Sequence, residues 1–118
     1  MIVRALREAE PFTTADGITI RELLGLPTAP VRNQSLAEAT LEPGQATQRH
    51  YHAETEEIYY LVEGTGLMEV DGDRREVWPG DAILIPPGAR HQITAVGERL
   101  RFLCCCAPAY RHEDTFFD

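Results

Sequence analysis

Two stretches of the chain decide its fold: residues 44–64 read GQATQRHYHAETEEIYYLVEG, and residues 80–95 read GDAILIPPGARHQITA. Together they carry three of the four histidines, His50, His52 and His91. Successive side chains of an extended strand point to opposite faces, so His50 and His52 project from one face while Tyr51 turns away. The two imidazoles therefore form half of a predicted ligand cluster.

The other half of the cluster comes from neighbouring strands. Glu57 offers a carboxylate oxygen and His91 offers a third imidazole nitrogen, a mixed set that suits a first-row divalent ion. We predict that His50, His52, Glu57 and His91 bind one divalent transition metal ion: Mn, Fe, Co, Ni, Cu or Zn, because this donor set does not select among them. The competing interpretation is a chance pair of surface or hydrogen-bonded histidines. The glycine and proline positions around the four residues argue against it.

Both stretches resemble the two motifs of the cupin family, G-x5-H-x-H-x3,4-E-x6-G and G-x5-P-x-G-x2-H-x3-N. Every fixed position matches except the last, where Ala95 replaces asparagine. In this family the asparagine is not a metal ligand, so we expect Ala95 to affect only a local turn or strand contact.

The resemblance implies a small single-domain cupin of the mannose-6-phosphate-isomerase-like type. Its fold would be all-β, a double-stranded β-helix or jelly-roll barrel, over residues 1–118. N-terminal strands would lie in residues 1–40, the two motifs at 44–64 and 80–95, and a short C-terminal tail at 107–118.

Turn residues punctuate the chain at short intervals, for example at Asp16-Gly17, Pro43-Gly44 and Asp71-Gly72. Such spacing is typical of an all-β sandwich or barrel. We predict strands at residues 19–24, 34–41, 47–52, 58–62, 66–70, 73–77, 82–85, 91–95 and 100–106. Gly64 and Gly66 are expected to bracket a hairpin, and residues 1–8 to form a short helix or an edge strand.

Strand alternation also predicts which side chains surround the ligands. Three pairs are expected to share a face with a ligand: Ala46 and Gln48 with His50, Tyr59 and Leu61 with Glu57, and Ile93 and Ala95 with His91. Tyr59 and Gln48 are the candidates for contact with a substrate or with the ligands. The alternative is that both are ordinary packed barrel residues.

Aromatic side chains on the opposite faces predict an interface. Tyr51, Tyr60 and Trp78 should point away from the metal, and outward aromatics on a small barrel favour a homodimer. The chain has a formal net charge of −8, and all eleven basic residues are arginine. Because an acidic surface repels phosphate backbones and anionic lipids, we expect neither nucleic acid nor membrane as a partner.

Composition also excludes several kinds of catalysis. Without lysine there is no Schiff-base chemistry and no phosphate-loop lysine. Ser35 is the only serine and does not lie in a G-x-S-x-G motif, which argues against a serine hydrolase. A sugar-phosphate isomerase would need arginines at the mouth of the site, for which Arg49 and Arg90 are the candidates.

Three consecutive cysteines, Cys104, Cys105 and Cys106, do not form a disulfide framework and fit a reducing compartment. Cys104 and Cys106 should share one strand face, where they either pack as small apolar residues or place a thiol near the metal. The N-terminal residues lack the apolar run of a secretory signal, and no apolar stretch is long enough to span a bilayer. We therefore expect a soluble, cytoplasmic protein.

An open site of three histidines and one glutamate favours an exchangeable ligand, whereas structural zinc sites are closed and usually rich in thiolates. The resemblance implies a metal-dependent enzyme acting on a small polar metabolite, of the dioxygenase, isomerase, epimerase or lyase type. Two alternatives remain: a non-catalytic module that binds a metal or small molecule, and a protein whose metal only pins its strands. His112, in an acidic run, is expected to be solvated and without function.

Overall fold

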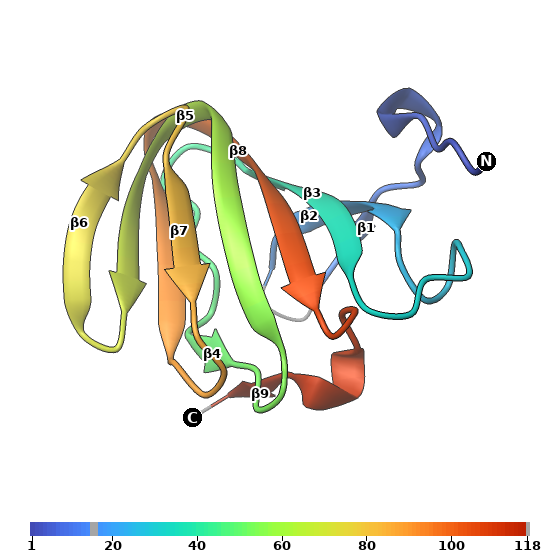
Figure 1. Ribbon diagram of the computed structural model, residues 1–118. Coiled ribbons are helices and arrows are strands. Elements are labelled where there is room, and N and C mark those ends of the chain that lie inside the picture. Colours follow the sequence, from blue (N-terminus) through green and yellow to red (C-terminus); the bar gives the residue numbers. More distant parts are fainter. Residues whose placement is uncertain (15–16, 118) are drawn as a thin grey trace.

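The structure is a computed structural model that describes residues 1–14 and 17–117 (Figure 1). The turn expected at Asp16-Gly17 lies partly outside these residues. In chain order the elements are η1 (Leu6–Glu8), β1 (Phe12–Thr13), β2 (Thr19–Leu24), β3 (Ser35–Leu41), β4 (His50–Tyr51), β5 (Glu56–Val70), β6 (Asp73–Val77), β7 (Ala82–Ile85), β8 (His91–Ala107), η2 (His112–Asp114) and β9 (Phe116–Phe117). No helix among the described residues is both long and apolar enough to cross a membrane.

Two long strands, β5 and β8, organise the barrel. They pair antiparallel along almost their whole length, from Glu56 opposite Ala107 to Val70 opposite His91. Register irregularities between Leu61 and Thr65 allow both strands to bend, so that each contributes one half to each of two sheets (Figure 1). One sheet has the order β1-β2-β3-β8-β5-β7, and the other has the order β9-β4-β8-β5-β6. The expected all-β, double-sheet architecture is confirmed.

The hairpin expected at Gly64 and Gly66 is wrong: β5 runs through both glycines and bends there instead of turning back. The strands predicted at 58–62 and 66–70 are the two halves of β5, and they pair with β7 and β6 respectively. Gly64 has φ 82°, and a Cβ atom there would lie 2.1 Å from the carbonyl oxygen of Arg99, so the bend requires glycine. The strands predicted at 91–95 and 100–106 are likewise halves of β8. Alternation identified each half but could not show that the strand continues through a bulge.

Most other predicted boundaries agree with the structure. The strands at 19–24, 73–77 and 82–85 have the predicted bounds, whereas the strand predicted at 47–52 is reduced to β4, His50–Tyr51. Before β4 the chain is irregular: Ala46 forms an isolated bridge with Thr94, and the hydroxyl of Thr47 accepts a hydrogen bond from the Ile93 N–H at 3.1 Å. At the N-terminus only η1 is helical.

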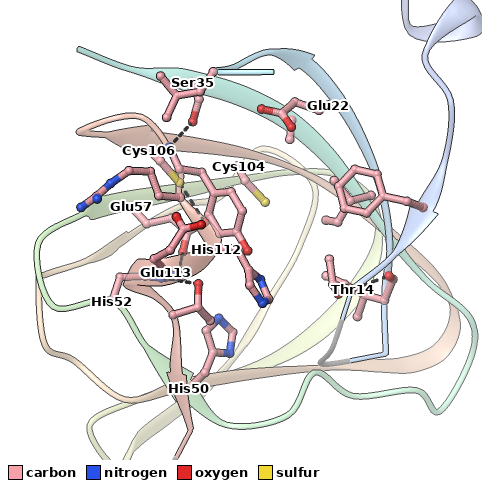
Figure 2. Close-up of a pocket in the computed structure, with 18 of the residues that line it drawn as sticks. Thr14, Glu22, Ser35, His50, His52, Glu57, Cys104, Cys106, His112 and Glu113 are labelled. Atoms are coloured by element: carbon pink, nitrogen blue, oxygen red, sulfur yellow. Dashed lines mark hydrogen bonds and ion pairs between the residues drawn. The ribbon is translucent and has the colours of Figure 1, made fainter. Parts of the chain in front are cut away.

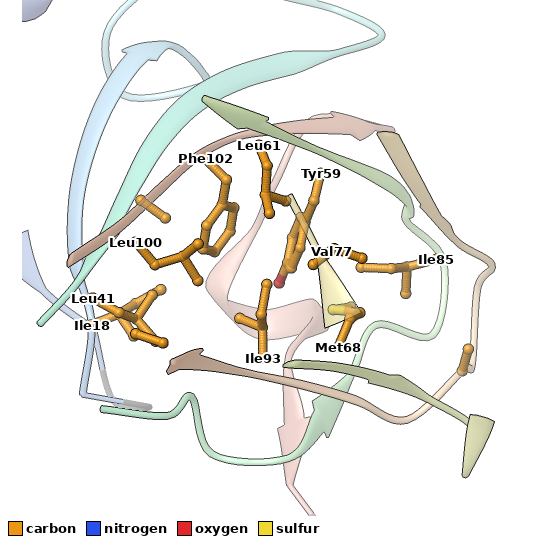
Figure 3. Close-up of a cluster of buried hydrophobic side chains, with 13 residues drawn as sticks. Ile18, Leu41, Tyr59, Leu61, Met68, Val77, Ile85, Ile93, Leu100 and Phe102 are labelled. Carbon is orange, nitrogen blue, oxygen red and sulfur yellow. The ribbon is translucent and has the colours of Figure 1, made fainter. Parts of the chain in front are cut away.

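The hydrophobic core lies between the two sheets. Figure 3 shows Leu61, Tyr59 and Phe102 of one sheet across from Met68 and Ile93 of the other. Full burial of a side chain of this size stabilises the fold by about 1.5–3 kcal/mol. Because Glu57 and His91 each lie two residues from a core residue on the same strand, the pleat directs them to the inside of the barrel as well. The inward face predicted for Tyr59, Leu61, Ile93 and Ala95 is confirmed by their burial.

The segment after β8 turns back over one end of the barrel instead of leading away from it (Figure 1). It forms η2 and then β9, which pairs with β4 through His50 opposite Phe117 and Tyr51 opposite Phe116. The residues expected to form a C-terminal tail therefore lie directly against the strand that carries the first histidine.

Candidate metal centre

Four candidate ligands meet at one end of the barrel. His50 begins β4 and is paired directly with His91, the first residue of β8; His52 follows β4, and Glu57 is the second residue of β5. All four are buried, with exposed fractions of 5%, 0%, 4% and 5% respectively. One ligand-capable atom from each of the three histidines lies within 4.8 Å of the other two. The structure thus brings together the residues that the spacing predicted, and Figure 2 shows His50, His52 and Glu57 among them.

Backbone carbonyls orient all three imidazoles. Nδ1 of His50 lies 2.7 Å from the carbonyl oxygen of Gln48. Nδ1 of His52 lies 3.0 Å from the carbonyl oxygen of Asp114, and Nδ1 of His91 lies 2.9 Å from that of Ala89. A carbonyl oxygen can only accept, so each Nδ1 carries the proton and donates it. This tautomer leaves the lone pair on Nε2, the arrangement in which a neutral histidine binds a metal.

Glu57 completes the cluster with one oxygen. Its Oε1 lies 3.3 Å from Nε2 of His52 and 3.6 Å from Nε2 of His91. Oε1 of Glu57 and Nε2 of His91 are fully buried, yet among the described residues neither has a hydrogen-bond partner. Buried polar atoms left in this way are costly unless something else satisfies them. A divalent cation would satisfy both, so the donors fit the predicted metal in number, type and orientation.

The same geometry shifts two pKa values. Burial alone would raise the pKa of Glu57, but the neighbouring His52 and His91 outweigh it and lower the pKa to about 2. Burial alone would lower the pKa of His52, but Glu57 and Asp114 outweigh it and raise the pKa. The carboxylate therefore stays ionised and attracts a positive charge, which a proton or a metal ion can provide.

A thiol supports the second oxygen of Glu57. Cys106 donates a hydrogen bond from Sγ to Oε2 at 3.3 Å. Ser35 is the strand partner of Cys106, and its hydroxyl oxygen accepts a hydrogen bond from the Tyr110 N–H at 2.9 Å. Cys104 lines the cavity beside the site, so the face shared by Cys104 and Cys106 is the inner one. The sequence left two roles open for these thiols: packing as small apolar residues, or a position beside the candidate ligands. Cys106 has the second, because it contacts Glu57.

Asp114 is a supporting residue that the sequence did not reveal. Its carboxylate accepts hydrogen bonds from the N–H groups of Ala53, Glu54 and Thr55, at 3.0–3.2 Å. Its carbonyl oxygen accepts the Nδ1 proton of His52. One residue thus fixes both the loop between His52 and Glu57 and the ring of His52. Within a polar run such as His112-Glu113-Asp114, no spacing signal separates this buried aspartate from its exposed neighbours.

A cavity of about 610 Å³ opens onto the ligands. His50, His52 and Glu57 line it, together with residues from β1, β2, β3, β8 and the C-terminal segment (Figure 2). Tyr59 is a core residue and also lines the cavity, with its ring 6.1 Å from that of His91. His112 is exposed, as expected, but it too borders the cavity.

Three other predicted residues lie elsewhere. The side chain of Gln48 is exposed, because the irregular segment before β4 does not continue the strand alternation; only its carbonyl serves the site. The predicted placement of Gln48 on the ligand face is therefore wrong. Arg49 pairs with Glu69, and the guanidinium of Arg90 stacks over the Tyr51 ring at 4.0 Å.

Ala95, which replaces the motif asparagine, has a structural role through its backbone. Its carbonyl accepts from the Gly44 N–H at 3.0 Å, and its N–H donates to the Gln45 oxygen at 2.9 Å. The side chain is buried in the core. These two bonds hold the start of the first motif against β8 without a side-chain amide.

The comparison with known proteins agrees with this geometry. The family model for the cupin domain matches residues 37–106. An uncharacterized protein of Methanocaldococcus jannaschii is 48% identical over 107 residues, which cover 90% of this chain and 86% of the relative. Polyketide synthase CurC of Streptomyces cyaneus is 30% identical over 93 residues, 79% of this chain and 60% of that relative's length. The solved structure of the polyketide cyclase RemF from Streptomyces resistomycificus superposes with a TM-score of 0.80 at 26% identity, covering 97% of this chain and 89% of RemF.

The class of protein defined here is a bent double-sheet β-barrel with three histidines and one glutamate grouped at one end as a possible metal site. The chain belongs to the cupin family.

Proposed function

We propose that this protein is a metal-dependent enzyme that acts on a small molecule at a centre formed by His50, His52, Glu57 and His91. One observation carries the proposal: four buried donors converge at a cavity of about 610 Å³, and three of them also line that cavity. A divalent ion bound there would supply Lewis acidity and exchangeable coordination positions.

The chain itself orients the donors and covers one end of the barrel. Backbone carbonyls hold the imidazoles, Cys106 holds the far oxygen of Glu57, and the C-terminal segment closes the end of the barrel over His50 and His52. A site built in this way keeps its donors in place before a substrate enters. Such preorganisation lowers the entropic cost of reaching a reactive geometry.

A purely structural metal is the less favoured alternative. A structural ion is normally enclosed by its ligands, whereas here His50, His52 and Glu57 face a cavity large enough for a metabolite. The polyketide names of two relatives support a small organic substrate. The non-catalytic binding module shares the same site and differs only in turnover.

The test begins with protein purified without chelators or a nickel-binding tag. We expect about one first-row divalent ion per chain, and turnover of at least one compound when oxygen uptake and product formation are followed over a metabolite panel. Full metal occupancy with tight ligand binding but no turnover would identify the binding module. Absence of metal from protein that refolds normally with added ions would contradict the centre itself.

A further inference from the structure

Resting on the proposed function, we propose that the cavity selects a neutral or singly charged ring compound with two adjacent oxygen atoms, and that it rejects phosphorylated and dicarboxylate substrates. Three features of the cavity support this class: its apolar wall, the sign of its charges, and the pairing of its arginine.

The wall built by the N-terminal strands is apolar. Phe12 comes from β1, Ile18 is the residue before β2, and Ile20 lies in β2. Leu26 and Pro27 come from the loop after β2. Cavities of about 300–1,000 Å³ suit metabolite-sized ligands, and this one falls within that range at about 610 Å³. A ring laid against this wall would displace water from apolar surface, which favours binding. A small dianion such as oxalate would leave most of this apolar surface in contact with water.

The charged groups around the cavity are mainly acidic. Glu22 and Glu113 line it in addition to Glu57. Among the described lining residues Arg111 is the only arginine, and its guanidinium is paired with Glu54 at 2.6 Å. Apart from the candidate ligands His50 and His52, His112 is the other lining side chain that can carry a positive charge, and it is followed directly by Glu113. A phosphate that enters must shed its water and finds carboxylates rather than a guanidinium fork.

The arginines that a phosphorylated substrate would need are committed elsewhere. Arg49 forms an ion pair with Glu69, whose side chain is buried. Arg90 stacks on Tyr51 and donates to the Gly88 oxygen at 3.1 Å. Neither residue lines the cavity. The expected requirement for a sugar-phosphate isomerase is therefore not met at this mouth.

The ligand end favours one ionised oxygen. Three neutral imidazoles and the Glu57 carboxylate carry one negative charge between them, so a divalent ion leaves one positive charge in excess. A phenolate or enolate beside a hydroxyl or carbonyl oxygen balances that charge and offers two donors. The ring that carries such a pair then extends toward the apolar wall.

The probes are chosen to separate the metal-binding group from the wall. Catechol and its naphthalene analogue share the same pair of adjacent hydroxyls and differ by one fused ring. With Co(II)-loaded protein, we expect both to shift the visible absorption spectrum, and calorimetry to show the naphthalene diol binding about tenfold tighter. Oxalate and glucose phosphate should leave the spectrum unchanged at the same concentrations.

A matched pair of variants tests the wall directly. Phe12 lines the cavity and is 45% exposed, so Phe12→Ala should fold normally. We expect it to remove most of the advantage of the naphthalene diol while catechol binds as before. Val96 has a similar exposure, 41%, and does not line the cavity, so Val96→Ala should change neither affinity.

The outcomes distinguish this inference from the proposed function. Equal affinity for the two diols, or a response to glucose phosphate as strong as that to the diols, would overturn the substrate class while leaving the metal centre in place. Failure of the parent protein to take up Co(II) would overturn the proposed function, and the substrate class with it.

Discussion

The Cys106 thiol donates a hydrogen bond to Oε2 of Glu57 at 3.3 Å, while Oε1 of the same carboxylate faces His52 and His91. Each oxygen of Glu57 therefore has a distinct environment. Burial, together with the charge of Glu57, raises the pKa of Cys106, so the thiol keeps its proton at neutral pH and remains a donor. Cys106 is a positioning residue that directs one oxygen toward the imidazoles.

Replacing Cys106 should weaken metal binding without unfolding the protein. Cys106→Ala frees Oε2 of Glu57, and loss of a partner that orients a ligand typically costs about tenfold or more in metal affinity. Cys106→Ser retains a donor and should recover part of the loss. Affinity is measured by competition with a chromophoric chelator, and the Co(II) absorption spectrum reports ligand geometry. Cys105→Ala, on the opposite strand face, is the control. Parent-like affinity and spectrum in Cys106→Ala would exclude the positioning role.

Metal content should depend on His52 and not on the fourth histidine. His52→Ala removes a buried nitrogen whose ring is fixed by Asp114, so we expect it to abolish stoichiometric binding. His112→Ala changes an exposed residue of η2 and should retain one ion per chain. Elemental analysis of both purified proteins gives the answer. A full equivalent of metal in His52→Ala would remove this residue from the ligand set.

Asp114→Asn should destabilise the protein in a pH-dependent way. Burial alone would raise the pKa of Asp114, but the N–H donors of Thr55, Glu54 and Ala53 outweigh it and hold the pKa below its usual range. A carboxyl with a lowered folded-state pKa stabilises the fold above its unfolded pKa, and this contribution disappears as the pH falls through the folded value. We expect a loss of about 1–3 kcal/mol at neutral pH that shrinks below about pH 4.

Urea unfolding of the parent and Asp114→Asn at neutral and acidic pH measures this difference. Glu113→Gln is the control, because Glu113 is exposed and adjacent in sequence. A difference between parent and Asp114→Asn that stays constant with pH would show that the ionised carboxylate is not the stabilising species.

Gly64→Ala should be far more costly than Gly72→Ala. Both glycines have positive φ, 82° and 84°, so both substitutions carry a backbone penalty of about 1–2 kcal/mol. Only at Gly64 would the new Cβ lie 2.1 Å from a backbone oxygen, that of Arg99, whereas nothing lies within 4 Å at Gly72. We expect Gly64→Ala to lower the free energy of unfolding by roughly 3 kcal/mol or more. Similar thermal midpoints for the two variants would mean that the bend does not constrain β5.

The sequence predicted the grouping of the four candidate ligands well because their signal is local. An alternating pair, a carboxylate and a third histidine at fixed distances from glycines need only strand geometry, and the structure does bring these residues together. The sequence missed what depends on the three-dimensional arrangement. Gln48 lies before a short strand whose alternation does not extend to it. Asp114 reaches the site only because the chain returns to Ala53 after 61 residues. The glycine pattern predicted a change of direction at Gly64. It did not predict that one strand passes through this point from one sheet into the other.

The outer face of the sheet formed by β8, β5 and β7 carries a row of exposed apolar side chains. Ile58 stands opposite both Leu84 and Cys105 in the strand pairing, and Tyr60 follows on the same face of β5. The exposed fractions are 40% for Ile58, 44% for Tyr60 and 55% for Leu84. A contiguous apolar surface of this kind is a candidate for contact with another protein.

We propose that this face joins two copies of the chain in a symmetric homodimer, since a two-fold axis matches one apolar row with its own copy. Light scattering at tens of micromolar should then give about twice the 13.2 kDa mass of the chain. Ile58→Glu places a charge in the middle of the row and should shift the mass toward the monomer, because an unpaired buried charge is costly. Val96→Glu is the control: Val96 is 41% exposed and is paired with Thr65, away from the row. A monomeric parent would contradict the dimer, whereas a dimer that tolerates Ile58→Glu would show that a different face is used.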